Sequence, residues 1–409
     1  MLLRIFPFPR SQMKHLGFKM AQNKKNGYSP IVSSQHSQEN VRDFPRVYTL
    51  HSQKGGVGKT SIALAIAGFA AFHNDKKTLI IDADFTGTSL LDIPETVSDH
   101  GKKYFNDFIL ANPSEFGKHT PVTSDQAKQK AEDTEKKFCW NIPKGNGKIF
   151  CMPGSPLVED MQKIVPLISQ EDHLRFFRHR LEDILVTATM AEFEVIIIDH
   201  SPGLLGLSKA SLLMVVDQAV SRHSREQHPN GPTRLDRLYR ASVNGLSKTR
   251  IAANAILVTT FDPVDYRASV PSYSFILVKM KKGLNSLDAL YGCVDMIFNK
   301  VPEHIEPVFE IPKVLKEVKG LPGRNVHEDL IGYFDARVKE VGAHVAINVE
   351  NFEMSKILET VKNLKTKQEP EYTQWENWCY HVGKTSRLNV KPREKLLATK
   401  KDHEKNNSK

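Results

Sequence analysis

The sequence is poor in cysteine and has no long apolar run. Both absences restrict the kinds of protein that it can be. Only four of its 409 residues are cysteines, and no two of them are spaced as Cys-x-x-Cys. We therefore expect neither a metal cluster nor a disulfide framework, and a reducing compartment fits. No stretch approaches the ~18 consecutive apolar residues of a membrane-spanning helix. The amino-terminal MLLRIFPFPR is short, is interrupted by prolines and lacks a small-residue cleavage site, so we expect a cytoplasmic protein.

Negative charge is scarce at the two ends of the chain, which carry the basic excess. The formal net charge is +10. Residues 1–46 hold eight Lys and Arg against two acids, and residues 381–409 hold nine against three. We interpret residues 1–45 as a disordered basic extension and residues 366–409 as a basic tail. Such tails are either solvated or contact nucleic acid.

Short apolar runs alternate with helical patterns through the rest of the chain, which we interpret as one domain at 46–365. Hydrophobic residues make up 40% of the chain and charged residues 25%, an ordinary globular composition. The predicted strands are 47–51, 77–82, 148–152, 193–199, 255–260 and 293–298. The predicted helices between and after them are 61–72, 103–111, 173–190, 208–220, 266–282 and 351–364. Uninterrupted apolar strands alternating with helices predict an α/β fold with a doubly wound, mainly parallel sheet.

Two segments interrupt this alternation and are predicted insertions. Residues 113–147 are rich in Lys, Glu, Gln and Pro with little periodicity, which indicates an insertion or a mobile loop. Residues 221–250 are basic, with seven Lys and Arg against two acids. Within them, Arg234, Arg237 and Arg240 would share one face of a helix. That face is either solvated or a contact for nucleic acid.

The sequence KGGVGKT at residues 54–60 lies between the first predicted strand and the first predicted helix. Its glycines allow backbone N–H groups to close on an anion, and the helix N-terminus adds unpaired N–H groups there. Lys59 can reach the β- and γ-phosphates of a nucleotide, and the Thr60 hydroxyl can ligate Mg²⁺. The loop and the start of the helix are therefore predicted to bind nucleotide through Gly55, Gly56, Val57, Gly58, Lys59, Thr60 and Ser61.

Acidic side chains follow two of the predicted strands. Asp82 and Asp84 end the strand at 77–82, and Asp199 ends the strand at 193–199 in the sequence DHSPG. Open α/β sheets bind ligands at the carboxyl ends of their strands, so these carboxylates are expected beside the phosphate loop. Asn299, at the end of the strand at 293–298, would either pair with an adenine edge or form a turn. His200 is interpreted as a structural residue.

These motifs together resemble the ParA/MinD family of ATPases, which has a deviant Walker A loop. Gln53 is closer to the partition-protein form of that loop than to the MinD form. The resemblance implies that Lys54 reaches across a dimer interface to the partner's nucleotide. It also implies that Asp84 positions the attacking water, that Asp199 holds Mg²⁺ through a water, and that Asn299 reads adenine.

The resemblance further implies an ATP hydrolase that forms a homodimer with ATP and uses the cycle to position or segregate DNA or another cargo. Its cofactors would be ATP and Mg²⁺. Expected partners are a second copy of the chain, an activating protein of the ParB type or another type, and non-specific DNA, which would place the protein at the nucleoid. Alternatives on the same fold are a MinD-like membrane positioner, a carrier or targeting ATPase, and a cobyrinate-synthase-type metabolic enzyme. A contact with membrane is not expected, because the basic carboxyl-terminal tail has few apolar residues.

Overall fold

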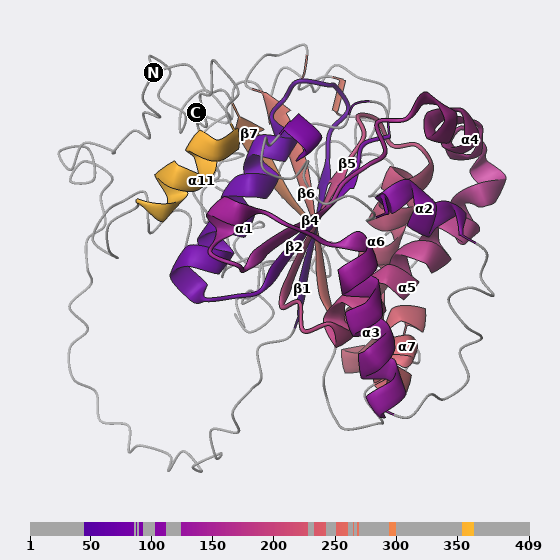
Figure 1. Cartoon of the computed structure of the whole chain (residues 1–409). Helices are drawn as coiled ribbons and strands as arrows, with labels where there is room; N and C mark the ends of the chain where they lie inside the picture. Colours follow the sequence, from indigo (N-terminus) through magenta and orange to yellow (C-terminus); the bar gives the residue numbers. More distant parts are fainter. Residues whose placement is uncertain are drawn as a thin grey trace, which may run out of the picture.

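The computed structural model describes residues 45–92 (except 86, 88 and 89), 103–111, 124–227, 233–242, 251–260, 265, 268, 269, 294–299 and 354–363. Within these ranges, seven strands form one sheet in the order β3-β4-β2-β5-β1-β6-β7 (Figure 1). The strands are β1 (Arg46–His51), β2 (Thr78–Ala83), β3 (Trp140–Asn141), β4 (Ile149–Met152), β5 (Val195–His200), β6 (Ala252–Thr260) and β7 (Val294–Asn299). Every neighbouring pair is parallel except β3 and β4, which are antiparallel.

The central strands are buried on both faces, which is why their sequences are mostly apolar. All six residues of β2 and of β5 are buried, and β1 is buried after its first residue. A strand with both faces covered carries apolar side chains through most of its length, and parallel sheets are built from such strands. The buried Asp82, Asp199 and His200 lie at the carboxyl ends of β2 and β5. The predicted doubly wound, mainly parallel fold is therefore confirmed.

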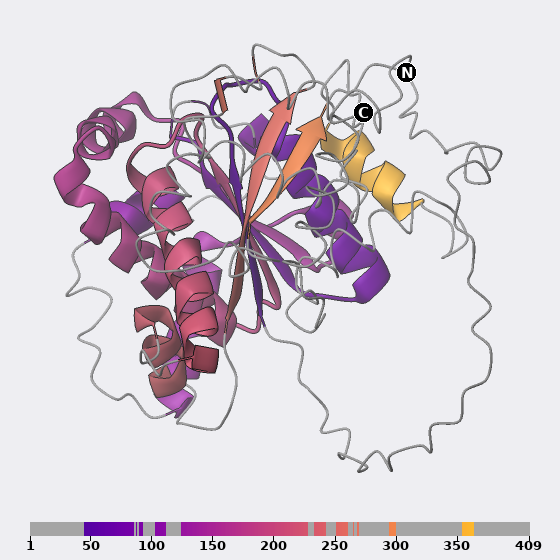
Figure 2. The ribbon, with the colours of Figure 1, turned by 180° about the vertical axis from the view of Figure 1, so that it is seen from behind.

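Helices cover both faces of the sheet. They are α1 (Lys59–Asn74), α2 (Phe105–Leu110), α3 (Ser124–Phe138), α4 (Val158–Ile168), α5 (Leu174–Met190), α6 (Gly206–Gln227), α7 (Arg234–Ser242) and α11 (Met354–Lys362). The two opposite views place α1 and α11 on one side of the sheet and the other labelled helices on the opposite side (Figures 1 and 2). Helix α11 packs on α1 at Gly68, where an added Cβ would lie 3.2 Å from Leu358 Cδ2. No helix in the described ranges is both long and apolar enough to cross a membrane.

Helix α3 lies inside the segment 113–147, for which the sequence predicted an insertion or a mobile loop. Its sequence is mostly charged, and its buried positions include Ala131 and Phe138. Glu135 also forms an ion pair with Lys77, at the start of β2, over 2.8 Å. A helix held by so few apolar contacts has little hydrophobic periodicity, which explains why the sequence did not indicate it.

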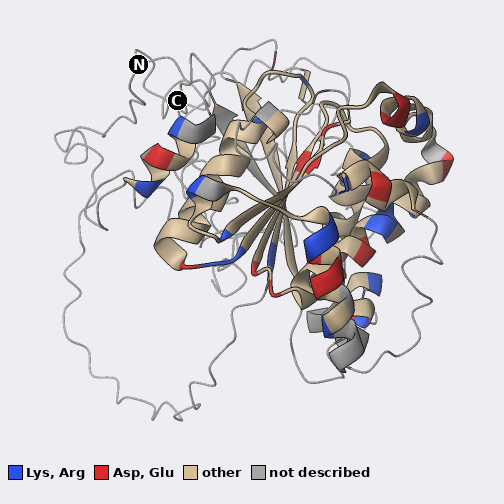
Figure 3. Cartoon of the chain, in the orientation of Figure 1, with Lys and Arg blue, Asp and Glu red and all other residues tan. Residues whose placement is uncertain are grey.

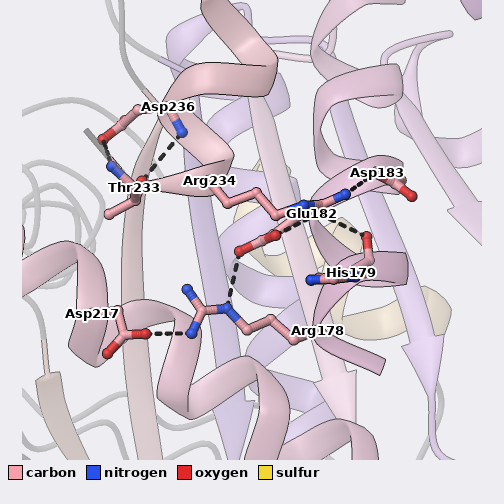
Figure 4. A network of polar contacts seen from close by, with 8 residues as sticks. All are labelled: Arg178, His179, Glu182, Asp183, Asp217, Thr233, Arg234 and Asp236. Atoms are coloured by element: carbon pink, nitrogen blue, oxygen red, sulfur yellow. Dashed lines mark hydrogen bonds and ion pairs between the residues drawn. The ribbon is translucent and has the colours of Figure 1, made fainter. Parts of the chain in front are cut away.

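Helix α7, in the second predicted insertion, is held by ion pairs to α5. Glu182 is fully buried on α5 and binds two guanidinium groups (Figure 4). Arg178 Nε lies 3.0 Å from its Oε1, and Arg234 Nη1 of α7 lies 2.6 Å from its Oε2. Arg234 also contacts Asp183 at 3.2 Å, and Arg178 also pairs with Asp217 of α6. One buried carboxylate thus ties α7 to α5 and, through Arg178, α5 to α6.

This network corrects one expectation about the arginines of α7. Arg234 does not present its charge outward, because the buried Glu182 and the neighbouring Asp183 bind it. Arg237 is exposed, and the side chain of Arg240 lies outside the described residues. Periodicity within a helix could not reveal a partner 52 residues away in the sequence.

Among the described residues, the charged ones lie mainly on the helices and at the ends of the strands (Figure 3). This distribution leaves the middle of the sheet apolar. The amino-terminal extension up to residue 44, the predicted helix at 266–282 apart from Ala268 and Ser269, and the tail at 366–409 lie outside the described residues.

Candidate active site

The loop between β1 and α1 forms an open cradle of backbone. Gly56 and Gly58 have φ angles of +71° and +89°, a region that other residues adopt only with strain. Gly58 caps α1 without a side-chain hydrogen bond, and the first turn of α1 contains no acidic residue. Residues 53–56 are exposed, whereas Val57 and Ser61 are buried. The helix N-terminus therefore directs N–H groups and partial positive charge to an accessible loop, an arrangement suited to an anion.

Thr60 and Asp199 meet at the base of this cradle. The Thr60 hydroxyl donates to Asp199 Oδ2 over 2.5 Å, although the two residues are 139 positions apart. Asp199 is 1% exposed, and its Oδ1 is buried without a hydrogen-bond partner in the described residues. A hydroxyl and a carboxylate oxygen are hard ligands of the kind that Mg²⁺ takes, with phosphates and waters completing its shell. The residues present therefore fit a magnesium ion.

Lys59 brings a positive charge to the same place. Only 7% of the residue is exposed. Burial raises the pKa of Asp199 to about 6, and the Lys59 charge and the Thr60 hydrogen bond both oppose that rise. A bound cation would favour the carboxylate form in the same way. The site is thus built so that Asp199 ionises when positive charge is next to it.

Asp82 and Asp84 lie at the end of β2, beside Asp199. Asp82 is directly opposite Asp199 in the parallel register of β2 and β5. Burial, followed by the Asp199 charge, raises the pKa of Asp82 well above its usual value. The backbone N–H of Asp84 donates to Asp82 Oδ1 over 3.1 Å, and the Asp84 side chain is only half-buried. Asp82 therefore shapes the strand end, while Asp84 is the carboxylate that solvent can reach.

Lys54 is bound by its own chain. Its ammonium group forms an ion pair with Asp265, a residue that the sequence analysis did not single out. The other oxygen of Asp265 accepts a hydrogen bond of 2.5 Å from Thr260, the last residue of β6. The Lys54 side chain is 57% exposed, so the pair lies at the surface of the loop. The only signal in the sequence that could have pointed to Asp265 is its place in TFDPVD, as a carboxylate near the end of a predicted strand.

Asn299, the last residue of β7, contacts the loop directly. Its Nδ2 donates to the carbonyl oxygen of Val57 over 2.7 Å, across 242 positions of sequence. The side chain is buried, and its Oδ1 has no hydrogen-bond partner in the described residues. The structure thus brings the predicted site residues from the loop after β1, from α1, from the end of β2, and from β5 and β7 to one edge of the sheet.

Two histidines form a buried stack beneath the site. The rings of His51 and His200 lie 4.8 Å apart, with 16° between their planes. His51 also bonds Thr49 Oγ1 at 2.8 Å and Ser208 Oγ, near the start of α6, at 3.0 Å. Burial and then the Lys59 charge lower the pKa of His51 to about 3. Both rings are neutral at pH 7, since burial lowers the pKa of His200 as well.

Comparison with known proteins gave one match that spans most of the chain. The model of the CobQ/CobB/MinD/ParA nucleotide binding domain matches residues 48–382. No match was found among curated protein sequences.

Several solved structures are similar at low identity. A plasmid partition protein from Borrelia burgdorferi is 15% identical, with 78% of this chain and 96% of that one covered and a TM-score of 0.39. A ParA family ATPase from Chlorobium tepidum is 15% identical, with 78% and 100% covered and a TM-score of 0.37. The cell division ATPase MinD from Pyrococcus furiosus is 14% identical, with 78% and 100% covered and a TM-score of 0.36. These low scores add nothing to the match of the family model.

Proposed function

The chain belongs to the CobQ/CobB/MinD/ParA family of nucleotide-binding proteins, and from this we propose that it is a ParA-like ATPase that dimerises when it binds ATP. The observation that carries the proposal is the contact between Thr60 and Asp199, beside the buried Lys59. It joins a phosphate cradle to a candidate magnesium ligand from a separate strand. The reaction would be phosphoryl transfer from ATP to water.

Each residue of the site has a proposed part in that transfer. The loop amides and Lys59 would hold the β- and γ-phosphates, and Thr60 and Asp199 would hold Mg²⁺, which supplies charge neutralisation when bound. Asp84 would orient the attacking water, because its carboxylate lies past the strand end and remains half-exposed. Positioning and electrostatics supply most of the acceleration in such reactions.

Lys54 would act on the site of the partner subunit. In that role its charge would stabilise the transition state as an arginine finger does, an effect worth on the order of 10³–10⁵ in rate in related chemistry. In the single chain, however, Lys54 is paired with Asp265. We therefore propose that this pair opens when two ATP-bound chains meet.

The proposed output of the cycle is the positioning or segregation of DNA or another cargo. The basic tails and the exposed Arg237 are the candidate DNA-binding groups, because contacts with phosphate dominate non-specific binding. The dimer would bind DNA and a partner protein would stimulate hydrolysis, which releases the dimer. The protein would then act in the cytoplasm at the nucleoid.

The first test is Lys59→Ala, with Lys163→Ala as the control. Lys163 lies on α4 with 63% of its side chain exposed, so its loss should change nothing. Lys59→Ala should reduce ATP binding, measured by calorimetry, and abolish hydrolysis, measured as phosphate release. If Lys59→Ala protein hydrolyses ATP at the wild-type rate, the assignment of this loop as the catalytic site is wrong.

A further inference from the structure

Asn299 and Gly58 fit against each other so closely that neither position has room for another group. A Cβ added to Gly58 would lie 2.1 Å from Asn299 Nδ2, which is well inside van der Waals contact. Gly58 also has a φ of +89°. Two features therefore favour glycine at position 58. One is its positive φ angle, and the other is the side-chain amide of Asn299, which lies 241 residues later in the sequence.

The orientation of the Asn299 amide follows from its partner. Val57 offers a carbonyl oxygen at 2.7 Å, and a carbonyl oxygen can only accept, so the NH₂ end of the side chain must face it. Asn299 is 1% exposed and cannot exchange this bond for one to water. Removing this donor would leave the buried Val57 carbonyl oxygen without its hydrogen bond from Asn299, which is unfavourable.

This bond also fixes the direction of a neighbouring N–H group. The peptide between Val57 and Gly58 is trans and planar, so its C=O and N–H point to opposite sides. With the carbonyl held toward β7, the N–H of Gly58 points away from β7. An anion nest needs successive N–H groups that converge, and a rotated peptide would replace one donor by a carbonyl that repels phosphate.

We propose that Asn299 is a positioning residue that sets the orientation of the Val57–Gly58 peptide for binding of the triphosphate. The inference rests on the proposed function, in that the loop must bind a nucleoside triphosphate. It differs from adenine reading, because its effect is exerted on phosphate through the backbone. The bond to Val57 uses one of the two N–H donors of the amide, and the Oδ1 atom is buried without a partner in the described residues.

The test compares three ligands that share a triphosphate and differ in the base: MgATP, MgGTP and magnesium tripolyphosphate. Binding is measured by calorimetry for the wild type, Asn299→Asp and Asn299→Ala. Both changes remove the donor to Val57, and the alanine variant does so without adding a buried charge. The control is Asn106→Asp on α2, where Asn106 is buried and accepts a 2.8 Å hydrogen bond from the Ser155 N–H. Circular dichroism and the unfolding temperature without ligand identify variants that have not folded.

The proposal predicts that both Asn299 variants bind all three ligands more weakly by a similar factor of about ten, the value of one lost hydrogen bond. Asn106→Asp should lower the unfolding temperature but leave all three affinities within twofold. A loss confined to MgATP would identify Asn299 as an adenine reader and overturn the proposal, as would unchanged affinities. Wild-type protein that binds none of the three ligands would refute the proposed function itself, and the inference with it.

Discussion

Lys54 and Asp265 form an ion pair within one chain, at the mouth of the phosphate loop. Asp265 is held for this contact by a 2.5 Å hydrogen bond from Thr260, at the end of β6. The resemblance to the ParA/MinD family implies that Lys54 works in the partner's site. In the single chain Asp265 binds this lysine, and in the proposed mechanism the pair would have to break before the lysine could reach the partner's site.

Asp265→Asn should make the ATP-dependent dimer form at lower protein concentration. Solvent screens the pair at its exposed Lys54 end, although the Asp265 side chain is only 10% exposed, so the concentration at half-maximal ATPase rate should fall by no more than about fivefold. The rate at saturating protein should stay unchanged, because Lys54 itself remains. Asp75→Asn, which removes another exposed ion pair with Lys148, is the control. A higher half-maximal concentration would mean that the pair supports the dimer.

Asp84→Ala should bind ATP normally and lose hydrolysis. The Asp84 carboxylate lies beyond β2, whereas the cradle is formed by the loop before α1, so phosphate binding should survive. Without hydrolysis the ATP dimer cannot release, and size-exclusion chromatography with MgATP should show a persistent dimer. A variant that remains monomeric and still releases phosphate would remove Asp84 from the mechanism.

The sequence was sufficient to predict the phosphate loop and six of the seven strands that the structure describes, because these are local patterns. The two-residue strand β3 lies in the segment that was predicted to be an insertion or a mobile loop, and it was not predicted. Each buried strand is a continuous apolar run, and the loop is a contiguous motif between a strand and a helix. Strand ends were predicted to within about three residues. Asp82, Asp84 and Asp199 could be placed together because parallel strands put their carboxyl ends at one edge.

Contacts between distant positions could not be predicted in the same way. Lys54 and Asp265 are 211 residues apart, and Asn299 and Val57 are 242 apart. The local sequence around each residue does not indicate which distant side chain or backbone group it will contact. Arg234 shows the same limit, since its helical spacing indicated an outward face and a buried carboxylate on α5 binds it instead.

His51→Gln should change how stability depends on pH. In the folded chain the pKa of His51 is about 3 instead of 6.5, so the unfolded chain takes up a proton first as pH falls. The stability that neutral His51 provides is therefore complete above pH 6.5 and is lost as pH falls from about 6.5 to about 3. The slope for one such group is about 1.4 kcal/mol per pH unit.

Urea unfolding at pH 7.5, 6 and 5 measures this effect. The excess stability of the wild type over His51→Gln should shrink by about 2 kcal/mol between pH 7.5 and pH 5. Thr49→Val removes the hydroxyl that bonds His51 Nε2 but keeps the imidazole. The difference in unfolding free energy between wild type and Thr49→Val should therefore vary less with pH. A pH-independent gap for His51→Gln would show that the ring can be protonated in the folded state.

Arg234 and Arg237 should have different effects on DNA binding. Arg234→Met leaves the buried Glu182 with one guanidinium fewer and should cost about 2 kcal/mol of stability. It should not change how DNA affinity depends on salt. Arg237→Met should reduce the log–log salt slope by ~0.9 for the phosphate contact it removes. An unchanged slope for Arg237→Met would leave the basic tails as the DNA-binding groups.

The claim that Lys54 completes the partner's site is tested most directly by mixing two inactive variants. Lys54→Ala and Asp84→Ala chains should each bind ATP and each be inactive alone. In a mixed dimer, the site on the Lys54→Ala chain keeps its own Asp84 and receives Lys54 from the other subunit. Equal mixtures should recover about a quarter of the wild-type ATPase rate, because random pairing makes about half of the dimers mixed and restores one of two sites in each. If mixed dimers form, as pull-down of differently tagged chains would show, and no activity returns, the proposed action of Lys54 across the interface is contradicted.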